Sequence, residues 1–151
     1  MTPHTKANLL IWGLILVAWG AWGLEQEAAF AAHTTMWSQD LAFFHQILFH
    51  ASQGEAWTSP ILLEPTGFFN MVHFHPILAA VLPLYWLRPE ATTLLWINAG
   101  AVAVTAWPLS LLGREATKSQ VFGVAAAAAW LIWLPSRSAA CLLYTSDAAD
   151  D

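Results

Sequence analysis

Asp40 is the residue of this sequence whose position most favours chemistry. It falls in an expected helix that begins after Ser38 and ends at Gln53-Gly54. At the helical step of about 100° per residue, one face of this helix is polar, with Gln39, Gln46, His50 and Gln53. Asp40 falls among the apolar residues Phe44, Ile47, Leu48 and Ala51. A carboxylate there loses hydration, and the free-energy cost is high unless a metal, a proton or a cationic substrate pairs with it. The alternative is an acid that interacts with the exposed amides of a first helical turn.

His73 and His75 form the second candidate, directly before Pro76. Alternate residues of an extended segment project to the same side, so both rings could face one ion. Imidazole with carboxylate suits Zn²⁺ or Mn²⁺. Polar residues at a membrane boundary give the same pattern, because His-x-His has no diagnostic ligand spacing. His45 and His50 lie on different flanks of the helix, and we expect both to face solvent.

The elements that must position these residues are membrane helices. The 151 residues are 58% hydrophobic and 10% charged, with ten Trp, whereas soluble domains are about 25% charged. Apolar stretches predict spans at about 8–24, 91–112 and 120–135, each near the roughly 20 residues that a crossing needs. A signal peptide remains an alternative for the first, since Ala29-Phe30-Ala31 resembles a cleavage site. The net charge of −5 and the lack of a basic patch argue against nucleic-acid binding.

Charge predicts the topology. Residues 25–75 contain no Lys or Arg, so the positive-inside rule places them outside as an external loop. Residues 76–87 are apolar, but they are short and contain Pro83, which favours a re-entrant or juxtamembrane helix. The basic turn at 113–118 then lies in the cytoplasm with the N-terminus. If 76–87 crosses instead, that turn lies outside.

The C-terminal stretch 141–151 resembles the translation of a transposase sequencing adapter. We therefore treat 136–151 as a non-native tail, the alternative being a natural polar tail. On this interpretation the natural protein continues, and 1–135 is its N-terminal part. Cys141 is the only cysteine, so no intramolecular disulfide is possible.

Three motifs of the chain resemble a known family. They are Trp37-Ser38-Gln39-Asp40-Leu41-Ala42-Phe43-Phe44-His45-Gln46, His73-Phe74-His75-Pro76 and Pro108-Leu109. Together, over Leu9 to Pro135, they resemble a family of uncharacterised bacterial and archaeal multipass membrane proteins that is grouped with the GT-C glycosyltransferases. The fold class expected is therefore an all-α membrane protein, a polytopic helical bundle with an external loop that carries amphipathic juxtamembrane helices.

The resemblance also implies a function. Such enzymes transfer a sugar from a polyprenyl-phosphate donor on the outer face of the plasma membrane, often with a divalent metal ion such as Mg²⁺, Mn²⁺ or Zn²⁺. By position, Asp40 would be the catalytic or metal-coordinating carboxylate, and His73 would lie near the lipid phosphate. His75 stands where the family usually has Ser, and Asp40 lacks the second acid of an Asp-x-Asp pair. We expect the fragment alone to be inactive. A non-enzymatic transporter subunit or scaffold is the alternative.

Overall fold

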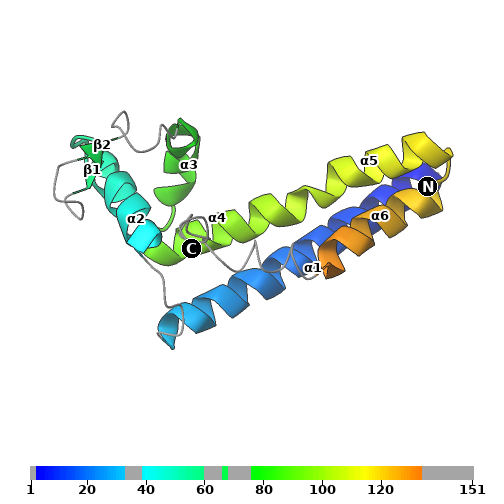
Figure 1. Ribbon diagram of the computed structural model, residues 1–151, viewed down its shortest axis with the longest axis horizontal. Coiled ribbons are helices and arrows are strands. Elements are labelled where there is room, and N and C mark those ends of the chain that lie inside the picture. The colour runs from blue at the N-terminus through cyan, green and yellow to red at the C-terminus, as the bar shows by residue number, and fades with distance from the viewer. Residues whose placement is uncertain (1–2, 33–38, 60–65, 68–75, 134–151) are drawn as a thin grey trace, which may run out of the picture.

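The computed structural model describes residues 3–32, 39–59, 66–67 and 76–133. Six helices and one short β-ribbon make up this part of the chain (Figure 1). They are α1 (Pro3–Ala31), α2 (Gln39–Ser52), β1 (Thr58–Ser59), β2 (Thr66–Gly67), α3 (Ile77–Tyr85), α4 (Ala91–Val104), α5 (Ala106–Thr117) and α6 (Gln120–Ile132). The strands are antiparallel, with Thr58 opposite Gly67 and Ser59 opposite Thr66.

An elongated bundle of α1, α4, α5 and α6 forms most of the molecule, and α2, the ribbon and α3 gather at one end of it (Figure 1). Two helical stretches, His4–Ala31 and Ala91–Thr117, are long and apolar enough to cross a membrane. Helix α6 is apolar but shorter. The expected fold class, an all-α membrane protein, is confirmed.

The second long stretch is interrupted between α4 and α5 at Thr105. Pro108 has no N–H, so the carbonyl of Val104, four residues before it, cannot receive the usual helical hydrogen bond. Nearby, the Val102 carbonyl accepts hydrogen bonds from Thr105 Oγ1 at 2.6 Å and from Trp130 Nε1 at 3.0 Å. Side chains thereby hydrogen-bond the backbone beside the interruption, and the bond from Trp130 connects it to α6.

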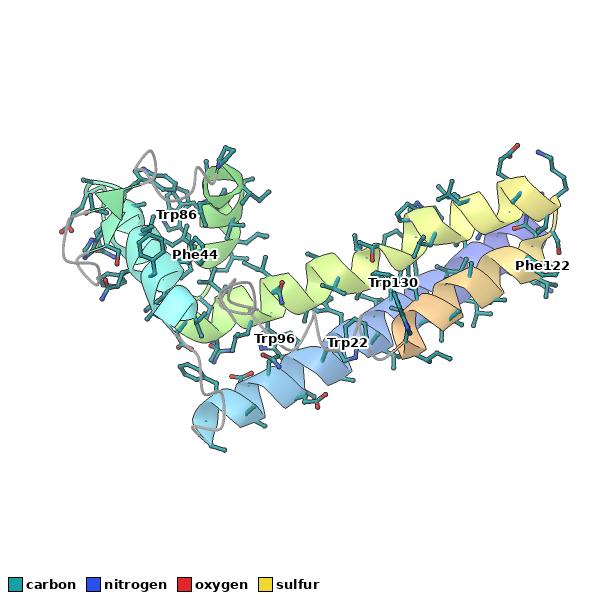
Figure 2. The ribbon with its side chains drawn as sticks, viewed as in Figure 1. Trp22, Phe44, Trp86, Trp96, Phe122 and Trp130 are labelled. Atoms are coloured by element: carbon teal, nitrogen blue, oxygen red, sulfur yellow. The ribbon has the colours of Figure 1, made fainter. Side chains whose placement is uncertain are left out.

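Small residues let the bundle helices approach closely. Its fully buried members include Ala99, Ala103, Ala106 and Ala127, which pack with Ile11, Ile15 and Trp22 of α1. Close packing of small residues is what holds membrane helices together, since lipid removes the hydrophobic driving force between them. Gly23 lies directly against the Trp96 ring, where any Cβ would clash. Figure 2 shows Trp22 and Trp96 between α1 and α4.

Two helices extend further than the sequence predicts. Helix α1 continues from the expected span through Ala31, so the start of the predicted loop 25–75 is helical. Helix α5 continues to Thr117, and only Lys118 and Ser119 separate it from α6. Gly113, expected in a turn, lies inside α5, and a Cβ there would lie 3.0 Å from the Phe122 carbonyl oxygen of α6. The glycine serves helix contact rather than a turn.

Candidate functional site

The juxtamembrane unit is defined as α2, β1, β2 and α3. Its helix α2 carries Asp40 and packs against the bundle. The apolar face of α2 buries Leu41, Ile47 and Leu48 in a core shared with α3 and α4. Gly54, with φ +78°, follows the end of the helix as expected, because glycine adopts the left-handed conformation without strain. The amphipathic pattern thus predicted both the helix and its buried face.

The polar face of α2 anchors strand β1. His50 Nδ1 donates a hydrogen bond of 3.0 Å to the Thr58 carbonyl, and Ser59 Oγ donates one of 2.8 Å to Gln46 Oε1. Ser59 is fully buried. The polar face is therefore partly used in folding, and His50 is not simply solvent-facing.

His45 also departs from the expectation that it faces solvent. Its Nδ1 is hydrogen-bonded at 2.8 Å to Oη of Tyr85, a fully buried residue of α3. Burial lowers the pKa of His45 and raises the pKa of Tyr85 to about 12, because a low-dielectric surrounding disfavours each charged form. The two side chains form a neutral link between α2 and α3.

Asp40 is the second residue of α2 and lies in its first turn. Its side chain, and all of His73 and His75, lie outside the described residues. Among the residues that the structure does describe, no three His, Cys, Asp or Glu side chains are grouped as a metal site would require. The metal site predicted from Asp40, His73 and His75 remains a prediction.

A long apolar groove runs between α1 and α4 and reaches the end of α3. Its volume is about 770 Å³, within the roughly 300–1,000 Å³ of small-molecule sites. Ile15, Leu16 and Trp19 line it from α1, and Trp96, Ile97 and Gly100 from α4. Leu84 and Leu87 line the end near α3. Such a groove suits a hydrocarbon chain.

Arg88 lies at this end of the groove, in a cluster of charged and indole groups. Its Nη2 donates a hydrogen bond of 2.9 Å to Glu27 Oε1, and its Nε donates one of 2.8 Å to Glu90 Oε2. The second oxygen of Glu27 accepts from Trp96 Nε1 at 3.0 Å, and Trp19 Nε1 donates to the Trp96 carbonyl at 2.8 Å. The groove is therefore apolar along its length and polar at one end.

Sequence reasoning missed this cluster, although one signal for it was present. Within residues 1–135, Arg88 is the one basic residue that the predicted topology leaves outside, and Glu25, Glu27 and Glu90 are acids on the same side. An isolated cation among carboxylates at a membrane surface is expected to pair. The sequence could not show which acid it meets, because Glu27 is 61 residues away.

A family model matches residues 33–140, and that family is described as predicted membrane protein (DUF2079). The chain belongs to this family. The matched segment includes α2 to α6 and leaves out α1. It ends just before Cys141, where the adapter-like stretch begins, and includes residues 136–140, which the sequence analysis assigned to the tail. No curated protein and no solved structure matches the chain. Family membership agrees with the expected class of uncharacterised membrane protein.

Proposed function

We propose that the chain is part of a GT-C-type membrane glycosyltransferase that takes a lipid-linked sugar as its donor on the outer face of the membrane. The observation that carries this proposal is the groove between α1 and α4, with its polar end at Arg88. The isoprenoid chain of the donor lies along the apolar walls, and its phosphate lies toward the polar end. The juxtamembrane unit carries Asp40 on a helix that packs against α3 and α4.

The charges at the polar end support a role for a metal ion. Arg88 is shared between the carboxylates of Glu27 and Glu90, so this cluster carries a net charge of about −1 and repels phosphate. A bound divalent cation would offset that repulsion, since such an ion is often the largest local charge in a site. In this proposal Asp40, His73 and His75 would hold the ion. Asp40 also suits the role of the base that activates the acceptor hydroxyl.

The catalytic role of Asp40 is tested by Asp40→Asn, which keeps volume and removes charge. With the protein expressed from its natural gene, we expect transfer from a polyprenyl-phosphate sugar to fall by about a hundredfold or more. Glu55→Gln is the matched control, because Glu55 is an exposed carboxylate after the same helix. Unchanged glycolipid and glycoprotein profiles in cells that carry Asp40→Asn would contradict the proposal and favour the transporter or scaffold.

The groove is tested separately with Ala101→Trp. Ala101 lines the groove and is exposed, so an indole there fills the space that the donor chain would occupy. We expect KM for the donor to rise while kcat changes little. Ala125→Trp, at an exposed position of α6 that does not line the groove, is the control. Equal effects of the two variants would argue against a donor in the groove.

A further inference from the structure

Helix α1 begins, and α5 turns into α6, at the opposite end of the bundle (Figure 1). A second pocket is lined by residues of these segments. Its volume is about 790 Å³. Its polar lining consists of His4, Arg114, Glu115, Lys118 and Gln120, and its apolar lining consists of Pro108, Leu111 and Leu112. The pocket therefore combines cationic groups with apolar side chains, and it is remote from the groove.

Arg114 has unused hydrogen-bonding capacity. Its Nη1 donates a hydrogen bond of 2.6 Å to Asn8 Oδ1, and the guanidinium lies 5.8 Å from the centre of the Trp107 ring. Its Nε and Nη2 are shielded from water and have no hydrogen-bond partner among the described residues, and the same holds for Oε1 of Gln120, which lines the same pocket. A charged donor left in this state is unfavourable. An anionic oxygen is the acceptor that best satisfies it.

Arg114 is the cation of this pocket that has no carboxylate partner among the described residues. Lys118 forms an ion pair with Glu115, and both side chains are exposed. Within the described part of the chain, no carboxylate lies within ion-pair distance of Arg114. The pocket thus carries a net positive charge that comes from Arg114.

Two backbone features favour an anion at the same place. Helix α6 begins at Gln120, and its N-cap residue Ser119 makes no side-chain capping hydrogen bond, so the first-turn amides remain available at the positive end of the helix dipole. Gly123 has no side chain, and a Cβ there would clash with the aliphatic part of Arg114. The absence of a side chain at Gly123 leaves room for Arg114 between α5 and α6.

The apolar part of the lining identifies the occupant. Leu111 and Leu112 are exposed on a helix that is long and apolar enough to cross a membrane, so acyl chains can cover them while an attached headgroup reaches Arg114. We propose that this pocket binds the phosphate headgroup of an anionic phospholipid. Basic pockets between helices at a membrane surface select such headgroups by charge. The site is independent of the proposed sugar transfer.

The test uses the full chain purified in detergent and titrated with phosphatidylglycerol or phosphatidylcholine of equal chain length, with bound lipid counted by native mass spectrometry. We expect phosphatidylglycerol to bind about fivefold to tenfold more tightly, as the charge of one cation without a carboxylate partner supplies. Arg114→Gln should abolish this preference. Lys118→Gln should reduce it less, because Lys118 already has a carboxylate partner. Lys6→Gln is the control, an exposed cation at the same end that does not line the pocket.

Several results would overturn the proposal. The first is equal affinity for the two lipids, and the second is a preference that survives in Arg114→Gln. The third is competition by inorganic phosphate at the concentration at which phosphatidylglycerol binds, which would assign the pocket to a free anion. Because Arg114→Gln also breaks the bond to Asn8 and can affect folding, the graded loss in Lys118→Gln is required as well. An effect of Lys6→Gln equal to that of Lys118→Gln would reduce the preference to general surface charge and contradict the site.

Discussion

Arg88 Nη2 lies 2.9 Å from Glu27 Oε1 and joins the turn before α4 to the end of α1 across 61 residues of sequence. Arg88 also meets Glu90, so one guanidinium neutralises two carboxylates. The pair lies at the polar end of the apolar groove, where α1 and α4 must stay in register for the groove to keep its shape.

Arg88→Gln should lower the melting temperature more than Glu27→Gln, because loss of the arginine leaves Glu27 and Glu90 as unpaired like charges. The double variant should be more stable than the sum of the single effects implies, since the two residues share one interaction. Thermal unfolding of the four proteins in detergent measures this coupling. Because both side chains are partly exposed, the coupling should shrink at high salt. Strictly additive effects at low salt would contradict it.

Burial of the His45 ring should make stability depend on pH. Burial lowers the pKa of His45, so between that lowered value and about 6.5 the unfolded chain binds the proton and the folded chain does not. Stability therefore falls as pH decreases through this window. Thermal unfolding followed from pH 7.5 to 5 should show the decrease, and His45→Gln should flatten it.

Tyr85→Phe separates the hydrogen bond from the pH effect. It removes the hydroxyl bound to His45 Nδ1, so stability should fall at every pH by about 1 kcal/mol, the net value of one hydrogen bond. The slope with pH should remain, because its cause is burial of the ring and not the hydroxyl. If Tyr85→Phe removes the slope instead, the pH dependence has a different origin.

Glycine substitutions should distinguish the close helix contacts from open positions. Gly23→Ala places a Cβ against the Trp96 ring, and Gly123→Ala places one 2.8 Å from the Ser110 carbonyl oxygen. Each should destabilise by about 1–3 kcal/mol, the usual effect of overpacking. Gly13→Ala is the matched control, since nothing lies within 4 Å of its Cβ position. Alanine there should be neutral or stabilise the helix by up to about 1 kcal/mol. Unfolding in detergent provides the comparison, and an equal loss in all three would contradict the packing.

Cysteine labelling tests the proposed topology. In a Cys141→Ser background, Gln53→Cys lies at an exposed position of the juxtamembrane unit, and Thr117→Cys at an exposed position of the opposite end. An impermeant thiol reagent applied to intact cells should modify the first and not the second until the membrane is opened. The opposite labelling pattern would mean that the charge bias was interpreted in the wrong direction.

Local patterns predicted the fold well where one face or one residue type dominated. The apolar face of α2 predicted its buried core, and Gly54 predicted the position where the helix stops. The end of α5 was misplaced because Gly113 has two possible uses, a turn or a close helix contact. Which use applies depends on whether residues of α6 pack against Gly113. Those residues lie further along the chain, so the local pattern around Gly113 does not reveal the contact.

The candidate site was harder to predict, because its contacts link distant residues. His45 was expected to face solvent, yet its partner Tyr85 lies 40 residues away. The groove needs α1 and α4 side by side, which no single segment specifies. For Asp40, His73 and His75, the sequence pattern and the family resemblance remain the basis of the prediction.

The two polar links of α1 to its neighbours also set a length. Asn8 binds Arg114 near one end of the helix, and Glu27 binds Arg88 near the other. At about 1.5 Å per residue these two positions are about 28 Å apart, close to the roughly 30 Å thickness of bilayer hydrocarbon. Each link can therefore lie near one surface of the hydrocarbon layer, with the apolar run from Leu9 to Leu24 between them. In a thinner bilayer the bundle would have to tilt. In a thicker bilayer one charged link would be drawn out of water.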